Sequence, residues 1–214
     1  MLGGMSDGVP FERPGVRGFL HRPAGSGGDG LVLAHGAGGD CNAPMLVAAA
    51  AAFSAAGLCV LRCDLPFRQR RPKGPPSPST AAADRDGLRR AVEAMRAQVR
   101  GRVFLGGRSY GGRQATLLAA EEPEVAAGLL LLSYPLHPPG KAERLRTEHF
   151  PRLSLPAVFV HGTRDVFGSI DELRRAVTAI PTPTQIVTID GAGHDLRKGR
   201  FDLGPIVTAL LNAG

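Results

Sequence analysis

The residues best suited to catalysis are a serine, an aspartate and a histidine, which occur in that order along the 214-residue chain. Ser109 lies in GGRSYGGR, Asp165 in VFVHGTRD and His194 in IDGAGHDL. A serine hydroxyl is a poor nucleophile at neutral pH unless a histidine takes its proton and a carboxylate holds that histidine in the correct tautomer. Together these residues predict acyl transfer by a Ser-His-Asp triad.

The pattern Gly-x-Ser-x-Gly around Ser109 is weak by itself, because a chain with 29 glycines produces such a string by chance. The alternative is a serine in a glycine-rich turn. Its surroundings favour the nucleophile: the apolar run VFLG precedes it and the helix-forming run GGRQATLLAAEE follows it. In this strand-turn-helix setting the serine sits on a tight, strained bend, and Gly107 and Gly111 leave room for the close approach of strand and helix.

A glycine-rich segment, HGAGG at 35–39, follows another apolar run. Acyl transfer requires hydrogen-bond donors for the developing oxyanion, and backbone amides are suited to this because they are fixed before the reaction. We expect an oxyanion hole in the region of Gly36 and Ala37, with the amide of Ala37 paired with that of Tyr110. We expect the side chain of His35 to fix this loop.

Several other residues compete for the roles of base and carboxylate. Asp165 and His194 also have structural interpretations, as a helix cap and as a surface-loop residue. The alternatives for these roles are His35, His137, His149 and His161 for the base, and Asp64, Asp171 and Asp190 for the carboxylate. Asp190 is the nearest competitor, since it lies close to His194 in sequence, whereas His161 is expected to shape the turn that presents Asp165.

Candidate substrate-binding residues are those that the loops around the site would carry. We expect substrate contacts from His35, Phe67, Arg70, Tyr134 and Phe167. Core packing explains an aromatic residue equally well.

The elements that must position these residues alternate along the chain. Continuous apolar runs at 31–36, 58–64, 102–107, 128–135, 157–162 and 184–191 predict strands. Continuous rather than alternating apolar character is typical of parallel strands that helices cover on both faces. Residues that typically begin or end helices predict helices at 43–57, 79–101, 169–180 and about 205–212. Segment 16–23 is expected to add an antiparallel edge strand. We predict a single α/β domain over 1–214, with no large cap.

Two connecting segments are irregular. The proline- and arginine-rich stretch 66–79 (PFRQRRPKGPPSPS) predicts a long loop beside the site. Its Arg68, Arg70 and Arg71 are expected either to contact an anionic substrate or a partner, or to be solvated. The second segment, 134–155, is too short for a multi-helix lid and is expected to form at most a small flap, which favours small or extended acyl substrates.

Composition excludes several classes of protein. No apolar run approaches the roughly 20 residues of a membrane helix, and the first residues lack the apolar core of a signal peptide, so we expect a soluble cytoplasmic protein. The net charge of +7 raises nucleic acid as a partner, but the arginines are scattered and lack interleaved aromatics, so none is expected. The three cysteines form neither a metal motif nor a disulfide framework, and no metal or cofactor is expected.

The motifs LVLAHGAGG, GGRSYGGR, VHGTRD and GAGHD resemble those of the α/β-hydrolase superfamily along nearly the whole chain. RSYGGR, SYPLHPPGK and GTRDVFG are similar to a small capless group of dienelactone-hydrolase-like proteins that includes a testis-expressed protein and a subunit of a histone acetyltransferase complex. The resemblance implies Ser109 as nucleophile, His194 as base and Asp165 as its partner. Dienelactone hydrolases proper use a cysteine where Ser109 stands, so the resemblance does not extend to their lactone substrate.

These observations predict an esterase-like serine hydrolase that cleaves a small ester or thioester through an acyl-enzyme. The alternative is an interaction protein that keeps the fold and binds a partner through its basic loop. A peptidase uses the same machinery, and the sequence does not separate amide from ester hydrolysis. The oligomeric state is left open.

Overall fold

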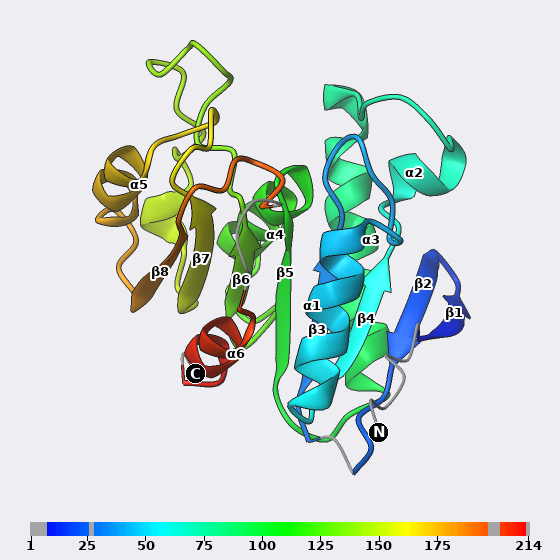
Figure 1. Cartoon of the computed structure of the whole chain (residues 1–214). Coiled ribbons are helices and arrows are strands. Elements are labelled where there is room, and N and C mark those ends of the chain that lie inside the picture. Colours follow the sequence, from blue (N-terminus) through cyan, green and yellow to red (C-terminus); the bar gives the residue numbers. More distant parts are fainter. Residues whose placement is uncertain (1–7, 26–27, 197–201, 213–214) are drawn as a thin grey trace.

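One mixed sheet organises the protein, for which a computed structural model describes residues 8–25, 28–196 and 202–212. Its strands are β1 (Val9–Arg13), β2 (Val16–His21), β3 (Gly30–Ala34), β4 (Cys59–Cys63), β5 (Val103–Arg108), β6 (Leu129–Leu132), β7 (Ala157–Gly162) and β8 (Thr184–Ile189). The order across the sheet is β1-β2-β4-β3-β5-β6-β7-β8. β3 to β8 run parallel, and β1 and β2 are antiparallel additions at one side (Figure 1).

Helices cover both faces of this sheet. They are α1 (Pro44–Ala55), α2 (Pro66–Arg70), α3 (Ala81–Arg96), α4 (Tyr110–Glu121), α5 (Ile170–Val177) and α6 (Gly204–Leu211). Figure 1 shows α1 and α6 in front of the sheet and α3 and α4 behind it. Short 3-10 turns at Pro78–Thr80 and Phe150–Arg152 complete the regular elements.

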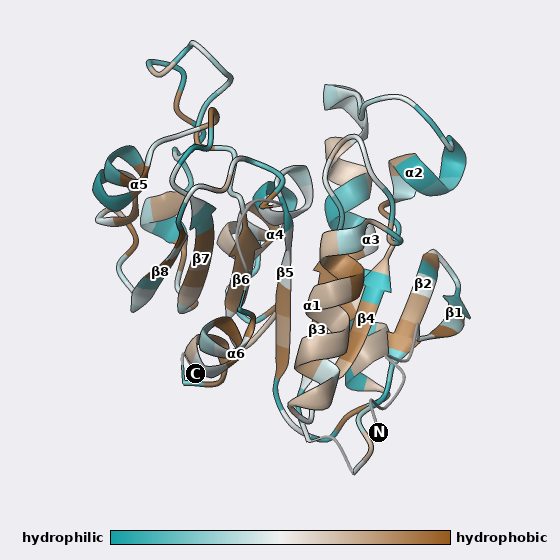
Figure 2. Ribbon diagram, viewed as in Figure 1, coloured by the Kyte–Doolittle hydropathy of each residue, from teal (hydrophilic) through white to brown (hydrophobic). Residues whose placement is uncertain are grey.

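The apolar runs fold as parallel strands because successive side chains of each run enter opposite cores. On β5, Phe104 packs with α1 and α6, whereas Leu105 packs with α3 and α4. β6 and β7 alternate in the same way, so their residues are buried on both faces. Figure 2 shows the resulting apolar centre of the sheet. The prediction of a parallel sheet between two helical layers is confirmed.

Helix ends follow the chemistry that the sequence contains. Ser169 caps α5, accepting a hydrogen bond from the amide of Glu172 while the Glu172 carboxylate accepts one from the amide of Ser169. This reciprocal pair satisfies two amides of the first turn. α1 begins at Pro44 and α2 at Pro66, positions where a missing N–H costs nothing.

The structure corrects four expectations about elements. Segment 66–79 is not loop throughout, because Pro66 begins the short helix α2 instead of breaking structure. β2 is not an edge strand, since β1 pairs with its outer side. α3 ends at Arg96, before Gly101. β8 lies at the edge of the sheet and is half-exposed, not covered on both faces.

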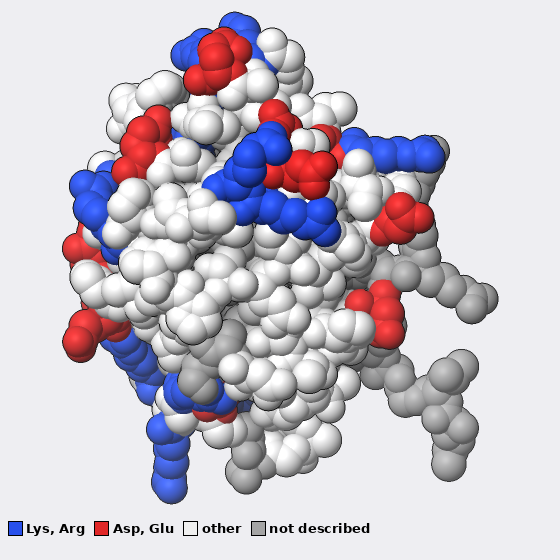
Figure 3. Space-filling model, turned by 90° about the vertical axis from the view of Figure 1, so that its left-hand side faces the viewer, with Lys and Arg blue, Asp and Glu red and all other residues white. Residues whose placement is uncertain are grey.

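On the side of the molecule that carries α5 and β8, positive and negative side chains are interspersed around a broad uncharged area (Figure 3). The net charge of +7 therefore does not gather into one basic patch on this face. Within the described ranges, no helix combines the length and apolar character needed to cross a bilayer.

Candidate active site

Ser109 lies between the end of β5 and the first residue of α4, in a backbone conformation that few L residues adopt. Its φ is 51° and its ψ is −113°, outside the main allowed regions. The turn closes tightly, because a Cβ on Gly107 would lie 2.7 Å from the Ala34 carbonyl oxygen and one on Gly111 would lie 2.6 Å from that of His35. Only glycine fits at these two positions, and the bend lifts the Ser109 hydroxyl to the carboxyl edge of the sheet.

His194 joins Ser109 to Asp165. Its Nε2 lies 2.8 Å from Ser109 Oγ, and its Nδ1 lies 2.8 and 3.0 Å from the two carboxylate oxygens of Asp165. An ionised carboxylate only accepts hydrogen bonds, so Nδ1–H donates to Asp165 and Nε2 is free to accept the proton of the Ser109 hydroxyl. The residues come from the ends of β5, β7 and β8, strands that run parallel and deliver them to one edge.

The carboxylate of Asp165 is fully buried and held from several sides. The amide of Phe167 donates to Oδ1 at 2.8 Å. His161 Nε2 donates to the Gly168 carbonyl at 2.8 Å and lies 3.7 Å from Asp165 Oδ2. His161 thus shapes the turn after β7, and the fixed carboxylate orients His194.

The loop after β3 reaches the nucleophile. A Cβ on Gly36 would lie 3.5 Å from Ser109 Cβ, so the segment of Gly36 and Ala37 borders Ser109. The Gly36 carbonyl accepts hydrogen bonds from the Gly39 amide at 3.1 Å and from His35 Nδ1 at 2.8 Å. Since C=O and N–H point in opposite directions across a trans peptide, this arrangement turns the Ala37 N–H away from His35. The Tyr110 amide, in the first turn of α4, has no partner within the helix.

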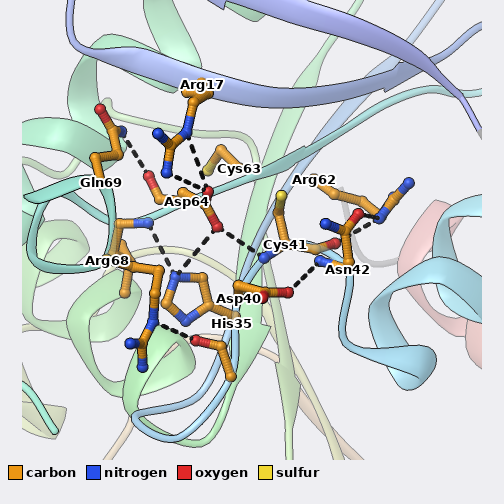
Figure 4. A network of polar contacts seen from close by, with 12 residues as sticks. Arg17, His35, Asp40, Cys41, Asn42, Arg62, Cys63, Asp64, Arg68 and Gln69 are labelled. Atoms are coloured by element: carbon orange, nitrogen blue, oxygen red, sulfur yellow. Dashed lines mark hydrogen bonds and ion pairs between the residues drawn. The ribbon is translucent and has the colours of Figure 1, made fainter. Parts of the chain in front are cut away.

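His35 and Asp64 lie next to this loop and hold it in place (Figure 4). His35 Nε2 accepts a hydrogen bond from the Leu65 amide at 3.1 Å, so its proton is on Nδ1 and the ring is neutral. Burial lowers the pKa of His35, although Asp64 opposes this shift. Asp64 Oδ1 accepts from the Cys41 amide at 2.8 Å, and its Oδ2 accepts from Arg17 Nη2 at 2.9 Å.

An open cavity of about 770 Å³ adjoins the site. It is lined by Gly38, Gly39 and Asp40 of the loop after β3, by Asn42, Ala43, Pro44, Met45 and Ala48 in and before α1, and by Arg108 and Asp195. Arg108 precedes Ser109, and its Nη2 donates to the His194 carbonyl at 3.1 Å. Asp195 follows His194. The cavity is thus lined by the chain neighbours of both residues, and its wall is apolar at Ala43, Pro44, Met45 and Ala48 and charged at Asp40, Arg108 and Asp195.

The expected substrate contacts are dispersed in the structure. Phe167 lies against the His194 ring, with centroids 4.1 Å apart, and Arg70 is exposed on α2. The other three are buried: His35 supports the loop, Phe67 packs between His35 and Tyr110, and Tyr134 donates its hydroxyl to the Arg146 carbonyl at 2.7 Å within the core. These three side chains are not placed to line an open site.

The competing residues lie elsewhere. Asp190 accepts a hydrogen bond from Thr163 Oγ1 at 3.2 Å, and Asp171 pairs with Arg174 at 3.0 Å. His149 bonds Thr116 on α4, and His137 lies 3.6 Å from Glu172. None of these four contacts involves His194 or Ser109.

Sequence reasoning missed two supporting residues. Buried Asp84 accepts hydrogen bonds from the Phe67 amide at 2.9 Å and the Tyr110 hydroxyl at 2.8 Å, which ties α2 and α4 to α3. Burial and this bond raise the pKa of Tyr110. The sequence feature that could have identified Asp84 is a carboxylate on the apolar face of α3, in register with Leu88 and Met95. No comparable feature of the sequence singles out Arg108.

No group of three or more His, Cys, Asp or Glu side chains within 8–25, 28–196 and 202–212 is arranged to hold a metal ion. Cys41, Cys59 and Cys63 are buried free thiols. Burial raises the pKa of all three, so they are poor metal ligands and poor nucleophiles.

The strand order, the strained serine after β5 and the loops that meet at this edge define the α/β-hydrolase fold. A model of the alpha/beta hydrolase domain family matches residues 28–202, and the chain belongs to that family. The prediction of an α/β-hydrolase fold is thereby confirmed. The region 133–149, which would have to carry a large cap, is a short irregular connection in the structure.

Solved structures support the fold. A dienelactone hydrolase from Anabaena variabilis is 22% identical, with 92% of this chain and 89% of that chain covered and a TM-score of 0.68. Est1E from Butyrivibrio proteoclasticus, solved with ferulic acid, is 16% identical (96% and 98% covered, TM-score 0.74). An α/β serine hydrolase without a lid, from Xanthomonas campestris, is 16% identical (96% and 91% covered, TM-score 0.67).

Proposed function

We propose that the protein is a serine hydrolase that cleaves a small ester or thioester through an acyl-enzyme. The observation that carries this proposal is the continuous hydrogen-bonded chain from Ser109 Oγ through His194 to Asp165. Family membership alone supports only hydrolase chemistry in general, since one fold hosts many functions.

In the proposed mechanism, Ser109 Oγ attacks the acyl carbon while His194 Nε2 accepts its proton. The carbonyl oxygen becomes an oxyanion that receives hydrogen bonds from the amides of Ala37 and Tyr110. His194 returns the proton to the leaving alkoxide or thiolate, and the C–O or C–S bond breaks. A water molecule then attacks the acyl-enzyme, His194 takes its proton, and Ser109 is regenerated with release of the acid.

We assign a small substrate molecule on the basis of the space around Ser109. One arm of the ester occupies the cavity between Gly39, Met45, Ala48 and Arg108, where the apolar side of the wall suits a short apolar group. The segment at 133–149 offers no large apolar cover for a long lipid chain. The buried free thiols Cys41, Cys59 and Cys63 fit a reducing compartment, and we place the reaction in the cytoplasm.

A fluorophosphonate probe tests the nucleophile, because an activated serine reacts with it quickly. We expect mass spectrometry to find the adduct on Ser109, and to find none in Ser109→Ala or His194→Ala. Hydrolysis of short p-nitrophenyl esters should disappear in the same variants. Esterase activity that persists unchanged in Ser109→Ala would overturn the mechanism.

The two aspartates near His194 provide a matched pair. In Asp165→Asn, the amide no longer holds His194 in the productive tautomer, so kcat should fall by about 10³-fold or more. Asp190→Asn should leave kcat within about twofold, because its carboxylate contacts Thr163 instead. The reverse result would assign the carboxylate to Asp190.

A purely partner-binding role, suggested by the resemblance to complex subunits, gains no specific support. It relied on a basic loop with three arginines, and Arg68 is buried with 5% of its surface exposed. Of the three arginines, Arg70 and Arg71 remain exposed, beside the exposed Lys73.

A further inference from the structure

Arg68 is a buried cation that no carboxylate neutralises among the residues that the structure describes. It lies on α2 with 5% of its surface exposed. Within those residues, the hydrogen bonds of its guanidinium all go to neutral groups. Burying a guanidinium is costly unless its donors are satisfied. The groups that satisfy it therefore indicate what the residue stabilises.

The guanidinium donates to four backbone carbonyls. Two belong to the loop after β3: Nε donates to the Gly39 oxygen at 2.8 Å, and Nη2 donates to the Ala37 oxygen at 3.1 Å. The other two, Arg71 and Gly74, belong to the segment that follows α2, at 3.2 and 3.1 Å. Figure 4 shows Arg68 and His35 side by side against this loop. The planar fork of arginine thus connects the loop after β3 to the loop after β4.

These contacts fix both peptide planes around Ala37. His35 Nδ1 and the Gly39 amide hold the Gly36 carbonyl, which sets the plane that carries the Ala37 N–H. Arg68 holds the Ala37 carbonyl, which sets the next plane and turns the Gly38 N–H to the opposite side. Rotation of the first plane would put the Gly36 carbonyl oxygen, with its partial negative charge, where the Ala37 N–H points. Arg68 restrains the second plane, which His35 does not contact, and so limits the movement of Ala37 from that side.

The charge of Arg68 acts in the same direction. Because Arg68 is bonded to the oxygen of the Ala37–Gly38 peptide, the negative end of that dipole is fixed toward Arg68 and its positive end, the Gly38 N–H, is fixed on the opposite side. In a buried setting such fixed dipoles stabilise developing negative charge without reorganisation. The effect of Arg68 on His35 agrees with this arrangement, since its charge helps to lower the pKa of that histidine and keep the ring neutral.

We propose that Arg68 is a positioning residue that preorganises the oxyanion hole by holding the carbonyls of Ala37 and Gly39 toward its guanidinium. The proposal rests on the serine hydrolase function above, and it assigns Arg68 no contact with substrate. It replaces the expectation that Arg68 meets an anionic substrate or a partner.

The test compares Arg68→Met and Arg68→Lys with Arg174→Met, a control whose side chain is 63% exposed and pairs with Asp171 on the same helix. Active sites are counted by the endpoint of fluorophosphonate labelling, and kcat and KM for p-nitrophenyl acetate are expressed per labelled site. We expect kcat of Arg68→Met to fall about 10- to 100-fold, with KM within about threefold. Arg68→Lys should recover part of the loss, because one ammonium reaches fewer carbonyls. Arg174→Met should match the wild type.

The affinity for a trifluoromethyl ketone is a second measurement, which a general loss of stability does not change. The ketone forms a tetrahedral adduct with the serine, and its affinity depends on the oxyanion hole. Affinity should fall in Arg68→Met by the same factor as kcat. If this variant does not fold, Arg68→Lys carries the same comparison.

Two results overturn the proposal. One is a raised KM with unchanged kcat, which would indicate a substrate contact. The other is unchanged kcat and ketone affinity per labelled site in both variants. Failure of the hydrolase function itself is distinguishable, because the wild-type protein would then show neither labelling of Ser109 nor turnover.

Discussion

The ring of Phe167 lies against that of His194, with centroids 4.1 Å apart and planes inclined by 33°. The backbone amide of Phe167 also donates to Asp165 Oδ1 at 2.8 Å. One residue therefore contacts both the imidazole and the carboxylate that orients it. The sequence predicts either a substrate contact or core packing for Phe167, and neither interpretation includes this contact with His194.

Replacing Phe167 by alanine should lower kcat for a p-nitrophenyl ester by about 10-fold or more, because small errors in the orientation of a catalytic group are costly. KM should change little, since the ring packs on His194 rather than on substrate. Steady-state kinetics separates the two effects. Val166→Ala is the control, because that neighbouring side chain is 63% exposed. A raised KM with wild-type kcat would support the substrate contact expected from the sequence.

Gly107→Ala should disturb the bend at Ser109. The added Cβ would lie 2.7 Å from the Ala34 carbonyl oxygen and 2.8 Å from the Gly111 carbonyl carbon, both of which are backbone atoms that cannot rotate away. We expect a loss of about 1–3 kcal/mol in the free energy of unfolding and a slower reaction with fluorophosphonate. Urea unfolding and labelling rates measure the two effects. In Gly28→Ala the new methyl group meets nothing within 4 Å, so neither quantity should change.

Ala48→Phe should reduce the cavity beside Ser109. Ala48 lies on its wall, and a phenyl ring there competes with the substrate arm. Two series of esters, one varying the acyl group and one varying the alcohol, show which arm is affected. In one series we expect kcat/KM for the larger members to fall about 10-fold relative to the smallest. Ala55→Phe, at the exposed end of the same helix, is the control. Unchanged profiles in both series would exclude this cavity as the binding site.

The sequence was most informative where a chemical residue directly follows an apolar run. Ser109, Asp165 and His194 each occur within a few residues of the end of a strand, so a parallel sheet alone brings them to one edge. The structure then places them in hydrogen-bond contact. Hydrophobic continuity predicted the central strands for the same reason, since a run buried on both faces has no polar positions to obscure it.

Contacts between loops could not be predicted in this way. The proline-rich composition of 66–79 predicts a long loop in which Arg68 either meets an anionic substrate or a partner or is solvated. Pro66 instead begins α2, which turns Arg68 inward toward Ala37 and Gly39. Composition does not reveal which of several neighbouring arginines is buried. β1 was missed because its strand, VPFER, is exposed at four of five positions and forms by pairing with β2.

Buried His149 should make stability depend on pH. Thr116 Oγ1 donates to the Arg113 carbonyl and so accepts from His149 Nε2–H at 2.8 Å. Burial, assisted by the charge of Arg113, lowers the pKa of His149 from 6.5 to about 4. Above pH 6.5 the ring is neutral in both the folded and the unfolded chain. As pH falls below that value, His149 binds a proton in the unfolded chain but not in the folded chain. The free energy of unfolding therefore decreases until about pH 4.

The loss attributable to His149 at pH 5 is about 2 kcal/mol. His149→Gln keeps a donor for Thr116 but does not titrate, so the comparison isolates this histidine from other groups, including His35. At pH 7.5 the variant should be less stable than the wild type, since it loses the ring contact with Phe150. Urea unfolding at pH 7.5 and pH 5 should show the difference shift by about 2 kcal/mol in favour of the variant. Parallel pH profiles for the two proteins would mean that His149 is protonated as readily in the folded chain as in the unfolded one.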